Sequence, residues 1–110
     1  SSTAPVVEIG EKKNIIVFSD AGFSPAILTI KVGETVTFVN ESDKEVWPAS
    51  ALHPSHDAYP VKGGCVGSKF DSCRCLKKGE SWLFKFDALG DWGYHDHLNA
   101  SSRGQVKVEK

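Results

Sequence analysis

Apolar residues alternate with polar residues along most of this chain, and this period of two constrains the fold more than any other feature. In TVTFVN, for example, Val36 and Phe38 share one face. Similar segments stand at 26–33, 81–87 and 104–109, and the segment at 14–20, NIIVFSD, is mostly apolar. Because successive strand residues point to opposite faces, each segment is predicted to be a half-buried strand of an antiparallel sheet. Helical periodicity is nearly absent, so the chain is predicted to be all-β.

Turn-forming clusters separate these segments and set the expected architecture. They read VGET, NESDKE, KKGES and ALGD. Strands at this spacing predict a Greek-key β-sandwich of about seven to eight strands. With 110 residues, 40% of them hydrophobic, the chain is long enough for one core and is interpreted as a single domain, 1–110. Residues 1–5, SSTAP, are expected to be a disordered lead.

One long interval, from about Pro48 to Lys78, shows no alternation and is predicted to be a long loop before the last strands. Prolines and glycines interrupt it, and it contains two histidines and all three cysteines. A loop of this length in a compact domain is usually functional or disordered. Tyr59 and Phe70 favour order, so a functional loop is expected.

The four histidines of the chain form two close pairs, HPSH and HDH. If a strand runs through Tyr94, His95 and His97 point to the same side of it, and His53 and His56 are close enough in a proline-stiffened turn to converge on one ion. Imidazole is a common ligand of copper and zinc, so His53, His56, His95 and His97 are predicted to form one metal site. The alternative is that each is an ordinary hydrogen-bonded histidine. Asp57 and Asp96 could orient imidazole rings, but both are expected to be solvated loop carboxylates.

Three cysteines lie within GGCVGSKFDSCRC. In an exported protein they predict one disulfide, and Cys65 with Cys73 is the expected pair, leaving Cys75 as a free thiol. A Cys65–Cys75 bridge is nearly as feasible. A third possibility is that Cys73 and Cys75 bind metal. If the disulfide forms, the protein is expected in the periplasm or outside the cell, as a mature, processed chain.

Two stretches, GFSPAILTIKVGETVTFVNES and GESWLFKFDALGDWGYHDHLNASSRGQVKVE, resemble the cupredoxins, small copper-binding β-sandwiches. The resemblance implies a Greek-key sandwich with a copper site at one end. It departs from the electron-transfer members in three ways: His95 stands where the cysteine ligand would follow the aromatic residue, methionine is absent, and Trp47 or Pro48 stands near the upstream histidine position. GYHDH and HPSH instead resemble histidine elements of multicopper oxidases.

These observations give three functional hypotheses. The first is a copper-binding cupredoxin-like protein with a non-blue, mononuclear, histidine-rich site, used for copper holding and delivery or for electron transfer, with a redox or copper-transfer protein as partner. The second, ranked lower, is a small copper oxidase or dismutase-like enzyme. The third is a metal-free interaction domain. Thirteen basic and fourteen acidic residues, without a basic block, argue against nucleic acid, and no apolar run is long enough for a transmembrane segment.

Overall fold

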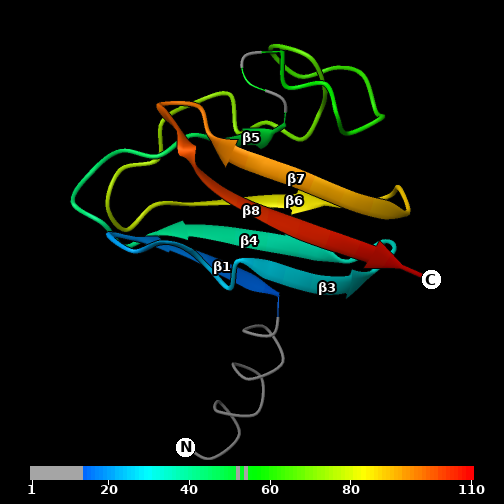
Figure 1. Ribbon diagram of the computed structural model, residues 1–110, viewed down its shortest axis with the longest axis horizontal. Coiled ribbons are helices and arrows are strands. Elements are labelled where there is room, and N and C mark those ends of the chain that lie inside the picture. The colour runs from blue at the N-terminus through cyan, green and yellow to red at the C-terminus, as the bar shows by residue number, and fades with distance from the viewer. Residues whose placement is uncertain (1–13, 52, 54) are drawn as a thin grey trace, which may run out of the picture.

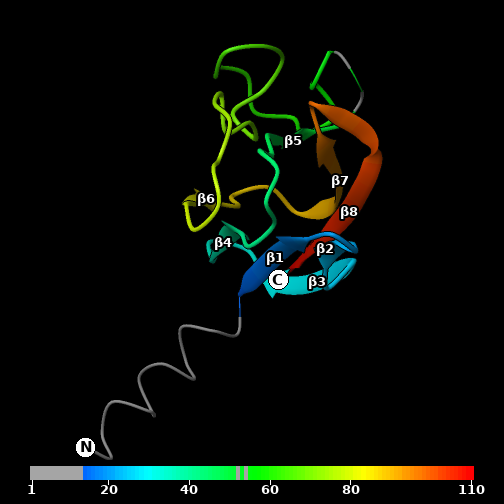
Figure 2. The same cartoon turned by 90° about the vertical axis from the view of Figure 1, so that its left-hand side faces the viewer.

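The computed structural model describes residues 14–51, 53 and 55–110, so the expected lead at residues 1–5 lies outside the described part. That part contains eight strands and no helix: β1 (Ile15–Ser19), β2 (Gly22–Ser24), β3 (Ile27–Lys31), β4 (Thr35–Asn40), β5 (Pro48–Ser50), β6 (Ser81–Lys85), β7 (Gly90–Asp96) and β8 (Asn99–Glu109). They form two four-stranded sheets, in the orders β2-β1-β4-β6 and β3-β8-β7-β5 (Figures 1 and 2). The predicted all-β sandwich is confirmed.

Both sheets are mixed, whereas the alternation pattern had suggested antiparallel sheets. β1 runs parallel to β4, with Ile16 opposite Phe38, and β3 runs parallel to β8, with Ile30 opposite Val108. The remaining pairs are antiparallel. The chain crosses to the second sheet at β3 and returns to the first at β4, so β1 and β4 become neighbours that run in the same direction.

An aromatic core fills the space between the sheets. Phe38 of β4 contacts Tyr94 of β7, with ring centroids 5.3 Å apart. Tyr59 and Phe70, from the long segment between β5 and β6, are also buried, and the Phe70 ring stacks on Phe84 at 5.2 Å. Burial of each aromatic side chain contributes about 1.5–3 kcal/mol. The long segment is therefore anchored in the core at two points, as Tyr59 and Phe70 had suggested.

The interval predicted as loop contains more pairing than expected. β5 occupies its first three residues and pairs with β7, placing Ala49 opposite His95. Isolated bridges join Val46 to Leu76 and Ala49 to Asp71. All three residues of β5 are buried, so apolar and polar residues do not alternate along it and the sequence pattern does not reveal this strand. These pairings bring the long segment against the end of β7.

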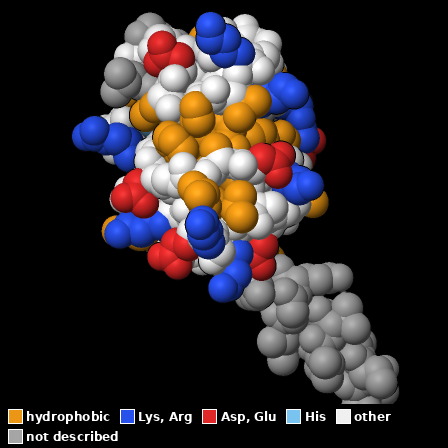
Figure 3. Space-filling view, turned by 90° about the vertical axis from the view of Figure 1, so that its right-hand side faces the viewer, with side chains coloured by type: hydrophobic (Ala, Val, Ile, Leu, Met, Phe, Trp, Pro, Cys, Tyr) orange, Lys and Arg blue, Asp and Glu red, His pale blue; other side chains and the backbone are white. Residues whose placement is uncertain are grey.

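The two ends of the sandwich differ in character. Figure 3 shows the end at which β7 begins: apolar side chains gather across it among charged ones, and no histidine is visible. The candidate site lies at the other end, where β7 finishes. Within the described residues, no helix is long and apolar enough to cross a membrane.

Candidate metal centre

β7 and the residues that follow it position His95 and His97. Tyr94 points into the core, so the neighbouring His95 side chain leaves the opposite face of the strand. The backbone N–H of His97 donates to the carbonyl oxygen of Trp47 at 2.8 Å, which fixes the chain beyond the strand end. His95 is thus held on the side of β7 that faces away from the core, and His97 lies just beyond the end of the strand.

The long segment carries His53 and His56 onto the same place. Ala51 N–H donates to the Gly93 carbonyl of β7 at 2.9 Å, and Ala58 N–H donates to the Ala51 carbonyl at 2.7 Å, so the residues that flank the two histidines are held beside β7. His56 has a positive φ of 55°, and its side chain is fully buried. A Cβ atom at Gly67 would overlap the carbonyl oxygen of Ser55. Only glycine therefore allows the backbone at residue 67 to pack against the backbone at Ser55 and His56.

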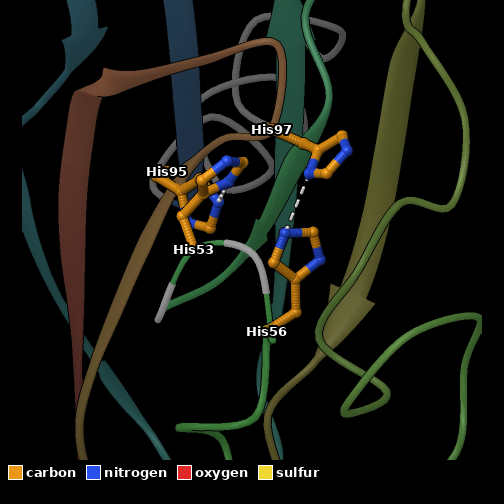
Figure 4. A group of neighbouring side chains, drawn as sticks. All are labelled: His53, His56, His95 and His97. Atoms are coloured by element: carbon orange, nitrogen blue, oxygen red, sulfur yellow. Dashed lines mark hydrogen bonds between the residues drawn. The ribbon is translucent and has the colours of Figure 1, made fainter.

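The structure brings all four predicted histidines together (Figure 4). Nδ1 of His53 lies 3.2 Å from Nε2 of His95, and Nδ1 of His97 lies 3.0 Å from Nε2 of His56. One nitrogen from each ring lies within 4.8 Å of the others. An ion with metal–nitrogen bonds of about 2.0 Å separates its ligand nitrogens by about 2.8 to 4 Å. The cluster is therefore close to the size that a single metal ion requires.

The surroundings of His95 and His97 favour the neutral form of these two rings. Burial, and then the nearby His56, His53 and His97, lower the pKa of His95 to about 4. Burial and the neighbouring imidazoles also lower the pKa of His97. Positive charges on adjacent rings would repel one another, so protonation is unfavourable here. Neutral imidazole is the form that binds metals, so His95 and His97 are prepared for a cation.

Asp71 is the functional residue that sequence reasoning missed. It is buried, and its Oδ2 accepts a hydrogen bond from Nδ1 of His56 at 2.8 Å. Its Oδ1 accepts from Nε1 of Trp47 at 2.6 Å and from the backbone N–H of Cys73 at 2.8 Å. A carboxylate bound to one imidazole nitrogen fixes the tautomer and leaves the other nitrogen for a metal. The only signal in the sequence was its position in the cysteine-containing loop.

The two aspartates considered from the sequence have other roles. Asp57 is exposed and accepts from the Ser55 hydroxyl, as expected of a solvated carboxylate. Asp96 is not solvated: it is 3% exposed, and its Oδ1 accepts from the backbone N–H groups of Trp47 and Leu98. Burial raises the pKa of Asp96, against the lowering effect of those two bonds. Neither carboxylate accepts a hydrogen bond from an imidazole ring. Through its bonds to Trp47 and Leu98, Asp96 instead stabilises the turn that carries His97.

The cysteines lie beside the cluster without joining it. Cys65 and Cys73 form a disulfide, with Cα atoms 5.8 Å apart, and Cys75 is a free thiol. Burial and the Glu45 carboxylate raise the pKa of the Cys75 thiol. Among the described residues, the four-histidine group contains no sulfur ligand. Because Cys73 is bridged to Cys65, the alternative in which Cys73 and Cys75 bind metal has no support in this geometry.

Comparison with known proteins identifies related sequences. A scan of protein-family profiles finds no match. The chain is 31% identical to chloroplastic plastocyanin of Tetradesmus obliquus over 111 residues, which covers 99% of this chain and 70% of that protein. It is 33% identical to plastocyanin of Scenedesmus fuscus over 90 residues, covering 79% of this chain and 86% of that one.

Solved structures share the fold. A purple cupredoxin from Nitrosopumilus maritimus superposes with a TM-score of 0.70 at 22% identity, covering 86% of this chain and 98% of that one. A Cu(I) form of an amicyanin mutant superposes with a TM-score of 0.69 at 21% identity, covering 86% and 80%. At these sequence identities, the structural similarity shows a shared fold and does not identify the metal ligands of this chain.

Proposed function

This chain belongs to the plastocyanin family of cupredoxins, which are copper-binding electron-transfer proteins, and from that premise we propose that His53, His56, His95 and His97 bind one copper ion in a non-blue site. The observation that carries the proposal is the convergence of four ring nitrogens, one per histidine, within 4.8 Å. Scattered structural histidines would each find a separate hydrogen-bond partner. Here the rings face one another.

The donor set fits copper in its oxidised state. Imidazole nitrogen is a good ligand for Cu(II), whereas Cu(I) prefers thiolate and thioether sulfur. The chain contains no methionine, and the thiol of Cys75 is outside the four-histidine group. The Asp71 carboxylate, bound to Nδ1 of His56, would keep Nε2 of that ring available to the metal. Bound copper would supply a redox-active cation at the end of the sandwich.

The same donor set favours copper holding and delivery over rapid electron transfer. A site without a sulfur ligand stabilises Cu(II) relative to Cu(I), so cycling between the two states is less favourable. The partner we propose is a protein that exchanges copper or electrons at this end of the sandwich. A disulfide between two exposed cysteines suits an oxidising compartment, so we place the protein in the periplasm or outside the cell.

Copper titration tests this proposal. Metal-free protein is titrated with Cu(II) against a chelator of known affinity, and bound copper is quantified after desalting. We expect one copper ion per chain in the parent. His56→Ala, His95→Ala and His97→Ala should lose most of the affinity, because the structure holds these rings in place, whereas His53→Ala, at the exposed member of the group, should lose less.

The matched control is Asp57→Asn, which alters an exposed carboxylate between the two histidine pairs in sequence without touching a ring. It should bind copper like the parent. Equal affinity in the parent, His95→Ala and His97→Ala would overturn the ligand assignment. Absence of copper binding by the parent would favour the metal-free interaction domain.

A further inference from the structure

A cavity of about 330 Å³ opens beside the histidine cluster, on the outer face of the β7–β8 pair. His53 and His95 form part of its lining, together with the side chain of Arg103. Gly93 also lines it, and the lack of a side chain at this position leaves space that a Cβ atom would otherwise enter. The cavity therefore gives a small molecule access to two of the four imidazoles. Its volume is at the lower end of those that hold small ligands.

The sheet register explains why a guanidinium stands here. Arg103 of β8 lies directly opposite His95 of β7, so the two side chains leave the same face of the sheet as neighbours. Arg103 is exposed, and within the described part of the chain no carboxylate or other acceptor pairs with it. A permanently charged, planar donor group is thus available at the mouth of the cavity.

A second cavity shows that this charge is local. It has a volume of about 660 Å³ and lies on the other side of the turn at Asp96 and Leu98. Its lining contains one basic residue, Lys44, and four acidic residues: Asp20, Asp43, Glu45 and Asp96. Those carboxylates repel anions, whereas the cavity at Arg103 attracts them. The two cavities therefore differ in the sign of the ligand that they favour.

We propose that the cavity at Arg103 binds a small monovalent anion, of the size of a short carboxylate, between the guanidinium and the copper ion. This inference rests on the proposed copper site. Arg103 pairs with one end of the anion through charge-assisted hydrogen bonds. The other end approaches the metal from the side lined by His53 and His95. His53 is the exposed member of the four histidines, so this is the side from which the metal can be reached.

Azide and acetate provide the test, because azide bound to Cu(II) gives a charge-transfer absorption band. Copper-loaded protein is titrated with azide, and acetate is then added as a competitor. We expect a saturable band that acetate reverses. Arg103→Leu should weaken azide binding by about tenfold or more, since a hydrogen bond to a charged group is lost, and Arg103→Lys should retain part of it.

Lys107→Leu is the matched control. Lys107 is also a β8 cation on the outer face, opposite Asp91, but it does not line the cavity. Copper content is measured for every variant before azide is added. If copper is bound and Arg103→Leu binds azide as tightly as the parent, the anion site is wrong and the copper site stands. If the parent binds no copper, the proposed function fails and this inference fails with it.

Discussion

Asp71 accepts a hydrogen bond from Nδ1 of His56 at 2.8 Å, with both side chains buried. The same carboxylate accepts the N–H of Cys73, which is bonded to Cys65. The bridge and the histidine cluster are therefore connected through one side chain. This arrangement explains how a long irregular segment can present His56 in a fixed orientation.

Replacing Asp71 with Asn should weaken copper binding by about 10- to 100-fold, the usual effect of altering a carboxylate that orients a metal-binding histidine. The amide keeps the shape of the side chain but loses its charge. Its NH2 group would face at least one of the N–H groups that now donate to Asp71, and two donors cannot form a hydrogen bond with each other. Affinity is measured by chelator competition. Asp57→Asn is the control, and an unchanged affinity in Asp71→Asn would show that His56 needs no carboxylate.

Removing the disulfide should destabilise the protein and the site together. Cys65→Ser combined with Cys73→Ser is expected to lower the free energy of unfolding by about 2–4 kcal/mol, because the open loop has more conformations to lose. Copper affinity should fall as well, because the position of Asp71 is less restrained. Denaturant unfolding measures the first effect. Counting thiols in denatured, unreduced parent protein should find one, and three would refute the bridge.

The stability of the metal-free protein should depend on pH through His95. Its pKa is about 4 in the folded chain, against about 6.5 when unfolded. Between these values the unfolded chain binds more protons, so the free energy of unfolding should fall as pH decreases from about 6.5 to about 4. Urea unfolding at several pH values measures this loss. His95→Gln cannot titrate and should lose less stability than the parent over that range; an identical loss would contradict the assignment.

The Tyr94 hydroxyl is buried and, within the described residues, has no hydrogen-bond partner. Burial also raises the pKa of this group. An unpaired buried hydroxyl is unfavourable, so Tyr94→Phe should increase the free energy of unfolding by about 1 kcal/mol. The ring contacts with Phe38 and Phe23 remain. Thermal or denaturant unfolding measures the change, and a clear loss of stability would mean that the hydroxyl is hydrogen bonded in solution.

The sequence could predict those parts of the fold that are half buried. β4 and the later part of β8 have one face in the core, so apolar and polar residues alternate along them. β1 and β6 alternate in burial although apolar residues also stand on their outer faces. β5 is buried on both faces. The first residues of β8, Asn99 to Arg103, show no apolar alternation, and pairing with β7 holds both ends of this stretch. Strand direction was also hidden, because alternation is the same in parallel and antiparallel pairs.

The candidate site was predictable where strand geometry applies. The direction of the His95 side chain follows from the alternation at Tyr94. His97 lies beyond the end of β7, after an irregularity in the strand register, so its position also depends on the hydrogen bond to Trp47. Asp71 was not predictable, because its contact with His56 depends on how an irregular loop folds over 15 residues. The partnership of Arg103 with His95 likewise depends on the register of β7 and β8.

The electronic spectrum of the Cu(II) protein tests the central claim most directly. Four imidazole ligands should give a pale protein with weak d–d absorption and, by electron spin resonance, the wide copper hyperfine splitting of nitrogen ligands in a tetragonal field. Cys75→Ser should leave both spectra unchanged, since its thiol is outside the histidine group. An intense visible band on adding one equivalent of Cu(II), lost in Cys75→Ser, would show a copper–thiolate bond and contradict the four-histidine site.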